Sequence, residues 1–344
     1  MSNLIDLQEP IIRQHKLPSH RKTNGLIRYG FNKTSQNGED GIIQRIFDLI
    51  PLRENQTYRW CIDVGAWDGK HLSNTYSLLT KENSEWRGIL IEAETLRFQQ
   101  LQDLYYQQDT KNKNICIHAH VSCDQKSSQR LSTLLDTHLV PQWYKRSTNI
   151  IDIDFISIDV DGCDYWVLHD LLYHPIMIEE TSITAFYRPL VICIEFNPTI
   201  PHEVVYIPPR NDAIRHGCSL SALCELLAGE DGSEAIGHEA ILRLLKRDFP
   251  DIEYVLVETT CYNAFFVRKD IFDLYITGEV PYANNLDALH QVTMGTKLYQ
   301  LYDGTIKLSG CKKLLWHRIP IEESEIQILK KQEDRVFPFS PKCT

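Results

Sequence analysis

The sequence has 344 residues, of which 43% are hydrophobic and 10% aromatic, so the chain can bury a sizeable core. Its 36 Lys and Arg against 46 Asp and Glu give a formal net charge of −10, which argues against a general binder of nucleic acid or of anionic membranes. The 16 glycines and 15 prolines are ordinary for this length and exclude collagen-like and low-complexity classes, which leaves an acidic, globular protein.

The ten cysteines fit best as small core residues of a protein in a reducing compartment. No C-x-x-C pair occurs, so the strongest zinc and thioredoxin-like patterns are absent. The N-terminal region lacks the apolar core of a secretory signal, and no apolar run approaches the roughly eighteen residues of a membrane span. We therefore expect a cytoplasmic protein without a membrane span, and no pattern indicates its oligomeric state.

The chain opens with a polar segment, residues 1–29, that shows no sustained periodicity and is expected to form an N-terminal arm. Apolar residues then recur at helical spacing, which predicts an amphipathic helix that ends before Pro51. These apolar residues are Ile42, Ile43, Ile46, Phe47 and Ile50.

Five short apolar runs follow, and each has the form of a strand buried on both faces. They span residues 60–65, 88–92, 115–121, 154–159 and 190–195. Helix-compatible segments such as 96–106 and 165–173 lie between them. Strands that alternate with helices in this way predict a parallel sheet that is covered on both faces.

Two later apolar runs, 254–258 and 264–267, are separated by only five residues, which is too few for a crossover helix. We therefore expect them to pair as an antiparallel hairpin. The prediction is an α/β fold, with a doubly wound, mostly parallel, seven-stranded sheet and a terminal antiparallel hairpin. This layout resembles the class I methyltransferase version of the Rossmann-like fold.

A long link between strands, residues 198–251, separates the fifth strand from the hairpin, and its segment 219–227 is predicted to be helical. Such insertions often carry substrate contacts, although many only cover a sheet edge. We expect the main domain to span 30–275. The remaining residues, 276–344, are expected to form a C-terminal extension that includes a turn at Asp303 and Gly304.

The strongest chemical signals stand at the carboxyl ends of the predicted strands, where doubly wound sheets bind ligands. The first is a glycine-containing turn after the first strand, with the candidate cofactor residues Asp63, Gly65, Ala66, Asp68 and Gly69. Glycine lets the backbone approach a ligand closely, but a purely structural turn is an equally good interpretation. Ala66 and Trp67 break the G-x-G-x-x-G spacing, which disfavours a nucleotide-binding oxidoreductase.

Glu92 ends the second predicted strand, and a carboxylate at that place can accept hydrogen bonds from both hydroxyls of a ribose. Glu94 is the alternative ribose ligand. After the third strand, Ser122 and Cys123 are small enough to bracket an adenine ring, although a plain loop explains them equally well.

Asp159, Asp161 and Asp164 form the densest acidic cluster of the sequence. Alternation of side chains along a strand predicts that Asp159 and Asp161 face the same side, and Glu195 lies beside them if their strands are neighbours. Such carboxylates can hold a divalent metal ion, act as a general base or bind a substrate through hydrogen bonds. Asp164 can instead cap the next helix, and Glu195 can be a buried acid satisfied by backbone amides.

Four segments, in this order, resemble the FkbM-type S-adenosylmethionine-dependent methyltransferases. They are Ser35–Asp40, Ile62–Gly69, Leu72–Thr75 and Ile156–Gly162. The resemblance covers about residues 30–268 and implies that the turn from Asp63 to Gly69, together with Glu92, holds S-adenosylmethionine. It also implies that Gln36 and Asp40 help to close the cofactor pocket. Asp161 stands where many members of the family have Glu.

The sequence thus predicts methyl transfer from S-adenosylmethionine to a hydroxyl of a sugar, a glycan or another small metabolite, with no nucleic-acid partner. Asp159, Asp161 and Glu195 are the candidate catalytic residues and also the candidate ligands of a divalent metal, and Asp159 is expected to contact the cofactor as well. His169 and His216 are further candidate bases. The alternative is a non-catalytic interaction protein that retains the fold.

Overall fold

The computed structural model of the chain describes residues 25–54, 56–81, 84–108, 114–138, 150–178, 183–200, 202, 204–228, 253–290, 297–300 and 306–309. Among these residues, no helix combines the length and the apolar character needed to cross a lipid bilayer.

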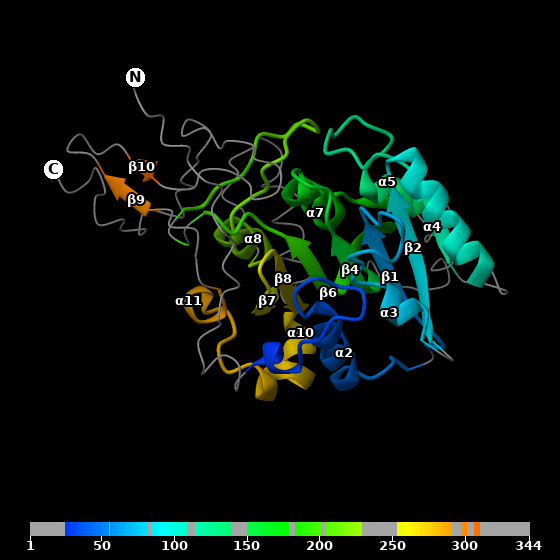
Figure 1. Cartoon of the computed structure of the whole chain (residues 1–344), viewed down its shortest axis with the longest axis horizontal. Helices are drawn as coiled ribbons and strands as arrows, with labels where there is room; N and C mark the ends of the chain where they lie inside the picture. Colours follow the sequence, from blue (N-terminus) through cyan, green and yellow to red (C-terminus); the bar gives the residue numbers. More distant parts are fainter. Residues whose placement is uncertain are drawn as a thin grey trace, which may run out of the picture.

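One mixed sheet forms the centre of the described structure, with its strands in the order β3-β2-β1-β4-β6-β8-β7 (Figure 1). The strands are β1 (Arg59–Val64), β2 (Trp86–Glu92), β3 (Ile115–His118), β4 (Ile150–Ile158), β5 (Ile176–Ile178), β6 (Ile183–Glu195), β7 (Tyr254–Thr259) and β8 (Asn263–Arg268). Neighbouring strands from β3 to β6 along this order are parallel, whereas β8 is antiparallel to both β6 and β7. This is the strand order of the class I methyltransferase version of the Rossmann-like fold, so the predicted fold class is confirmed.

Several strands differ in length from the predicted runs, and the pairing explains the difference for β3 and β6. β3 ends at His118, because it bonds only to β2, and β2 ends at Glu92, the partner of His118. β6 begins at residue 183 rather than 190, and its early part pairs in antiparallel fashion with the short strand β5, which the sequence did not predict.

Helices cover both faces of the sheet. They are η1 (Leu26–Tyr29), α2 (Glu39–Leu49), α3 (Tyr76–Leu79), α4 (Thr95–Gln108), α5 (Leu131–His138), α7 (Asp164–Tyr173), α8 (Leu220–Leu227), α10 (Lys269–Ile271), η2 (Phe272–Ile276), η3 (Thr277–Glu279) and α11 (Leu286–Leu289). Alternation along the strands separates two cores: Ile62 and Ile156 pack towards α5, α7 and α8, whereas Cys61 and Phe155 pack towards η1 and α2. The predicted helices at 42–50, 96–106, 165–173 and 219–227 are confirmed as α2, α4, α7 and α8.

The described residues on either side of this α/β core pack against it. Leu26 is fully buried, and the backbone N–H of Ile27 donates to Glu258 Oε2 at 2.8 Å. Beyond residue 275, Ile276 and Val280 are buried in the same apolar cluster as Leu26. Described residues on both sides of the predicted 30–275 domain therefore contribute to the folded core.

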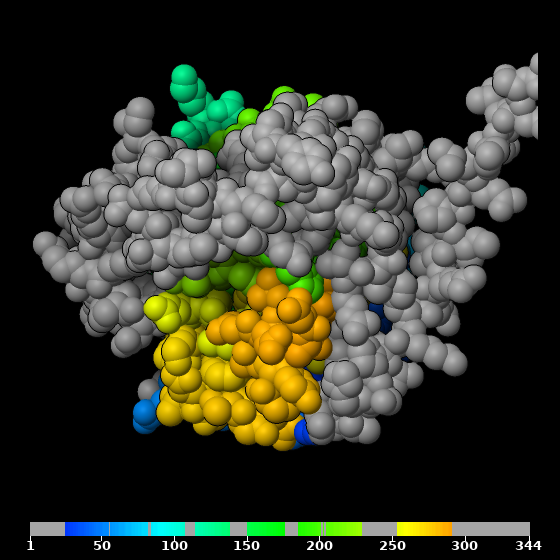
Figure 2. Space-filling view, turned by 90° about the vertical axis from the view of Figure 1, so that its left-hand side faces the viewer, coloured from blue at the N-terminus to red at the C-terminus, as the bar shows by residue number. Residues whose placement is uncertain are grey.

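The edge strand β7 is covered by the segment that follows β8. Asn284 has a φ of 59° and binds the backbone of β7 twice, because its N–H donates to the Leu256 carbonyl and its Oδ1 accepts from the Leu256 N–H. Figure 2 views this side of the molecule, where the yellow and orange residues of 253–290 form a continuous surface. Covering an edge in this way protects it from pairing with another chain.

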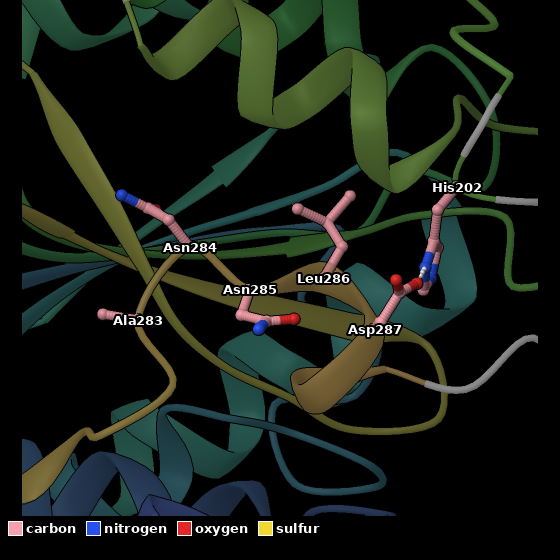
Figure 3. Close-up of a pocket in the computed structure, with 6 residues that line it drawn as sticks. All are labelled: His202, Ala283, Asn284, Asn285, Leu286 and Asp287. Carbon is pink, nitrogen blue, oxygen red and sulfur yellow. Dashed lines mark hydrogen bonds and ion pairs between the residues drawn. The ribbon is translucent and has the colours of Figure 1, made fainter.

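A shallow cavity of about 410 Å³ lies beside α11 (Figure 3). It is lined by His202, Ala283, Asn284, Asn285, Leu286 and Asp287. The imidazole of His202 faces the carboxylate of Asp287, with 2.8 Å between Nδ1 and Oδ1. Further along the chain, β9 (Lys297–Gln300) and β10 (Ile306–Ser309) form a separate antiparallel pair. The turn predicted at residues 303–304 lies outside the described residues.

Candidate functional site

A cavity of about 620 Å³ opens at the carboxyl ends of the parallel strands, the end to which the arrowheads of β1, β4 and β6 point in Figure 1. Seven carboxylates line it: Glu39, Asp63, Glu92, Asp159, Asp161, Glu195 and Asp212. The predicted site residues that line it are Gln36, Asp63, Gly65, Ala66, Glu92, Asp159, Asp161 and Glu195. Asp40, Asp68, Gly69, Ser122 and Cys123 are not among the lining residues.

The turn after β1 is shaped by a close approach of two backbone segments. Gly65 has a φ of 85°, and a Cβ atom there would lie 1.8 Å from the carbonyl oxygen of Asp159. The sequence predicted that this glycine allows a ligand to approach, but the nearest neighbour it admits is the backbone after β4. Asp68 and Gly69 serve the same turn, since Asp68 Oδ1 accepts the N–H groups of Lys70 and His71 and the Gly69 N–H donates to the Ala66 carbonyl.

Asp63 is the last residue but one of β1 and lines the cavity, although its exposed fraction is only 5%. Its Oδ2 accepts hydrogen bonds from Thr75 Oγ1 at 2.6 Å and from Ser73 Oγ at 3.3 Å. Burial raises the pKa of Asp63 to about 6, although both hydroxyl donors lower it and the charge of Glu92 raises it further. Keeping the ionised carboxylate of Asp63 at the cavity therefore lowers the stability of the fold.

Glu92 ends β2 with both carboxylate oxygens oriented by the backbone. Oε2 accepts from the N–H of Trp67 at 2.8 Å, and Oε1 accepts from the N–H of Glu94 at 2.7 Å. The Glu94 carboxylate instead accepts the N–H groups of Leu96 and Arg97 at the start of α4 and does not line the cavity. Of the two predicted ribose ligands, only Glu92 faces the cavity.

The loop after β3 reaches the cavity through other residues than those predicted. Ser122 Oγ donates to Asp212 Oδ2 at 2.6 Å, and the Cys123 N–H donates to Asp212 Oδ1 at 2.7 Å. These hydrogen bonds lower the pKa of Asp212 against the effect of its burial. Asp212 itself lines the cavity, together with His120 and Val121 from this loop. Sequence reasoning missed Asp212, because it lies in the long link and belongs to no recognisable pattern.

The loop before α2 supplies one predicted residue and one that was missed. Gln36 lines the cavity, whereas Asp40 Oδ2 accepts three backbone N–H groups, from residues 33 to 35, and so shapes the loop from behind. Glu39 also lines the cavity, and its Oε2 accepts from the N–H groups of Gln36 and Asn37. The sequence did not single out Glu39, because an acidic residue in the first turn of a helix is common for structural reasons.

The carboxylates of Asp159, Asp161 and Glu195 come together, with one oxygen of each within 4.8 Å of the others. Glu195 lies beside Asp159 because β4 and β6 are neighbours and Ile158 pairs with Ile194. The predicted strand alternation is not the reason for the proximity of Asp159 and Asp161. β4 ends at Ile158, and Asp161 has a left-handed φ of 56°, so a turn brings the two side chains together.

The charges in this cluster oppose one another. Burial, followed by the charges of Asp164 and Asp161, raises the pKa of Asp159 well above its ordinary value. Because the side chain of Asp159 is exposed to the cavity, water there weakens the effect of burial, and repulsion by its neighbours is the cause that remains. Burial and the charge of Asp159 likewise raise the pKa of Glu195.

Asp164 stabilises the loop that carries Asp159 and Asp161. It is fully buried, and its carboxylate accepts from the N–H of Val160 at 2.8 Å and from the N–H of Gly162 at 2.9 Å. It therefore fixes the loop after β4, and the N-cap position of α7 belongs to Cys163. Burial raises the pKa of Asp164 to about 6.

Neither histidine proposed as a base lines the cavity. His169 is buried in α7, where its ring packs against Tyr165 and Tyr173. His216 is buried and its Nε2 bonds to the hydroxyl of Tyr206. The basic residues that do line it are His71, His120 and Arg215, and Arg215 brings a fixed positive charge to a cavity that carboxylates dominate.

Comparisons with known proteins give likenesses of structure alone, since no protein-family model and no curated protein matches the chain. The METTL16 MTase domain (crystal form 2) has a TM-score of 0.25 and 15% identity, over 46% of this chain and 51% of that chain. The N-terminal domain of human METTL16 in complex with SAH has a TM-score of 0.32 and 14% identity, over 66% of this chain and 68% of that chain. The CurJ carbon methyltransferase has a TM-score of 0.31 and 10% identity, over 67% of this chain and 52% of that chain. This chain thus spans about half the length of the first and the last of these.

Proposed function

We propose that the protein is an S-adenosylmethionine-dependent methyltransferase that methylates a hydroxyl oxygen of a sugar, a glycan or another small metabolite. The observation that carries the proposal is the cavity at the carboxyl ends of the parallel strands. The turn at Gly65, the oriented carboxylate of Glu92 and the acidic cluster at Asp159 all meet there. The resemblance to FkbM-type methyltransferases, drawn from the sequence, implies the same activity.

Glu92 is the residue proposed to bind the ribose of the cofactor. Each of its carboxylate oxygens accepts one backbone N–H and keeps a second lone pair, so the group can still accept two hydroxyls of a vicinal diol. The N–H bonds hold the carboxylate in place, which reduces the entropy lost on binding. The other carboxylates of the cavity favour a ligand that carries a sulfonium and an ammonium charge.

Bound S-adenosylmethionine supplies a methyl group that its sulfonium makes electrophilic, and SAH is the leaving thioether. The residues of this chain then have two tasks, which are to align the acceptor oxygen with the methyl carbon and to take the hydroxyl proton. Glu195 and Asp159 are proposed for the second task. Their raised pKa values make them stronger bases than ordinary carboxylates once they are ionised.

Calorimetric titration of the full chain with S-adenosylmethionine and with SAH tests this function. The wild type should bind both, and Glu92→Gln should weaken binding by about 10- to 100-fold, the value of one or two hydrogen bonds to a charged group. The amide nitrogen of glutamine would also face one of the two N–H donors and turn the side chain away. Glu94→Gln is the matched control and should leave the affinity unchanged, because Glu94 does not line the cavity.

Two results would contradict the proposal. If the wild type binds neither compound, the non-catalytic interaction protein becomes the better interpretation. If Glu94→Gln weakens binding as much as Glu92→Gln, Glu92 is not the ribose ligand.

A further inference from the structure

The acidic cluster contains oxygen atoms that the surrounding protein does not satisfy. Glu195 is only 4% exposed and lines the cavity, yet no N–H or O–H group of the described residues donates a hydrogen bond to its carboxylate. Asn263, its register partner on β8, is 6% exposed and also lines the cavity. The buried Oδ1 atom of Asn263 has no hydrogen-bond partner among the described residues. A buried polar atom normally has a hydrogen-bond partner, so the unpartnered Oδ1 of Asn263 beside the nearly buried Glu195 points to a ligand at this place.

We propose that Asp159, Asp161 and Glu195, with Asn263 beside them, bind one divalent cation that holds the acceptor hydroxyl. The cation site itself follows from these oxygen atoms alone. The part concerning the acceptor rests on the methyl transfer proposed above.

The spacing of the cluster suits a single ion. Two ligands of one ion can be separated by at most twice the metal–oxygen distance, which is about 4.2 Å for Mg²⁺ and about 5 Å for Ca²⁺. The oxygen atoms of Asp159, Asp161 and Glu195 lie within 4.8 Å of one another. They can therefore bind a Ca²⁺-sized ion as they stand, and a small inward rotation of the side chains fits Mg²⁺ or Mn²⁺.

The charge of the cluster calls for a cation. No Lys, Arg or His of the described residues forms an ion pair with Asp159 or Glu195. Arg215 lines the same cavity, but its Nη1 donates to the backbone carbonyls of Asp212 and Ile214. A divalent ion offsets two of the three negative charges, whereas a protonated amine offsets one. Carboxylate and amide oxygens select a hard ion such as Mg²⁺, Mn²⁺ or Ca²⁺.

A cation at this place gives the cluster a chemical role. Three carboxylates leave coordination positions open towards the cavity, where an acceptor hydroxyl can bind. An ion held there would lower the pKa of that hydroxyl, so that the second carboxylate oxygen of Asp159 or Glu195, which does not bind the ion, would take its proton more readily. The deprotonated oxygen would then attack the methyl carbon, with SAH as the leaving thioether.

Titration of the metal-free full chain with Mn²⁺, followed by electron paramagnetic resonance and calorimetry, tests the site. The wild type should bind one equivalent, and Glu195→Gln and Asp161→Asn should each weaken Mn²⁺ binding by at least roughly tenfold, since even partners behind a metal ligand contribute 10- to 100-fold. Asparagine also accepts the left-handed backbone of position 161. The matched control is Asp287→Asn, which removes a carboxylate from the separate cavity beside His202 (Figure 3) and should leave binding unchanged.

The proposal is overturned if the wild type shows no saturable Mn²⁺ binding, if Glu195→Gln binds as tightly as the wild type, or if only Asp287→Asn loses the ion. Binding of S-adenosylmethionine in the presence of EDTA is measured on the same samples. It shows that the variants are folded, and it separates the two proposals. A wild type that binds the cofactor but no Mn²⁺ loses only the cation site, whereas one that binds Mn²⁺ at the cluster but no cofactor loses only the methyltransferase assignment.

Discussion

Replacing Asp63 by Asn should stabilise the fold at neutral pH while weakening cofactor binding. The carboxyl group of Asp63 is 5% exposed, and burial raises its pKa to about 6. Asparagine is nearly isosteric, and its Oδ1 can still accept from Thr75 Oγ1 and Ser73 Oγ, the two donors that now bind Asp63 Oδ2. Its amide nitrogen then faces the cavity. The substitution therefore removes a buried charge without removing the hydrogen bonds.

The size and the sign of the change in unfolding free energy follow from the pKa of the carboxyl group in the folded and the unfolded chain. With a pKa near 6 in the folded chain and near 4 in the unfolded chain, ionisation costs the fold about 3 kcal/mol above pH 7. The favourable protonated state is fully present below about pH 4, and its contribution is lost as the pH rises through about 6. Asp63→Asn lacks this titration. Its advantage over the wild type should be about 3 kcal/mol at pH 8, about half of that at pH 5, and absent at pH 3.5.

Urea denaturation of both proteins between pH 5 and 8 measures this difference, because all other titrating groups are common to the two chains. The reasoning is refuted if the difference in unfolding free energy does not change with pH, or if Asp63→Asn is the less stable protein at pH 8. The affinity for S-adenosylmethionine, measured on the same samples, should fall, since the variant removes one negative charge that faces the cavity.

Two further substitutions test the local structure around the site. Gly65→Ala should lower the unfolding free energy by more than about 2 kcal/mol, because a Cβ atom at this left-handed position would lie 1.8 Å from the carbonyl oxygen of Asp159. Gly278→Ala is the control and should change the unfolding free energy by less than about 1 kcal/mol, because a Cβ atom there would have no neighbour within 4 Å. Equal effects of the two substitutions in urea denaturation would contradict this prediction. Ser219→Ala should lower the unfolding free energy by about 1–3 kcal/mol in the same assay, because the fully buried Ser219 Oγ accepts from the N–H groups of Tyr206 and Ala222. An unchanged denaturation midpoint would show that these N–H groups find other partners.

The fold could be predicted from the sequence because its signals are local. The apolar runs around Ile62 and Ile156 each mark one strand, and the three-residue connection from Thr260 to Tyr262 leaves no choice other than a hairpin. The helical spacing of Ile42 and Ile46 likewise needs no knowledge of distant residues. Strand β5 could not be found in this way, because it is defined by its pairing with the early part of β6.

Apart from Gln36, which the family resemblance supplied, the candidate site could be predicted only where its residues stand at or just after the end of a strand. Glu92 and Glu195 end parallel strands and Asp63 is the last residue but one of β1, so the topology alone brings them to one edge of the sheet. Asp212 and Asn263 reach the cavity from a long link and from the hairpin, and their positions depend on contacts between segments that are far apart in the sequence. Site residues that are placed by contacts between distant segments therefore cannot be predicted from the local sequence pattern.

Asp161 shows how a correct juxtaposition can have a different cause from the expected one. Strand alternation and a left-handed turn both bring its side chain towards Asp159, but they have different consequences for substitution. A residue in a strand tolerates branched side chains, whereas a left-handed turn favours Gly, Asn or Asp. The turn is followed by Gly162, at which a Cβ atom would lie 2.0 Å from the carbonyl oxygen of Ile214. The cluster is thus held by backbone geometry on one side and by the strand end at Glu195 on the other.

The carboxylates at the strand ends lower the stability of the protein that carries them. Asp63, Asp164 and Glu195 are buried groups whose pKa values burial raises, so each opposes folding at neutral pH. Asp164 holds a loop through two backbone hydrogen bonds, which gives it a structural reason to be there. Glu195 has no such bond among the described residues, and a leucine or glutamine in its place would cost the fold less. A ligand that is bound by Glu195 and absent from the unfolded chain is the physical reason that accounts for this carboxylate.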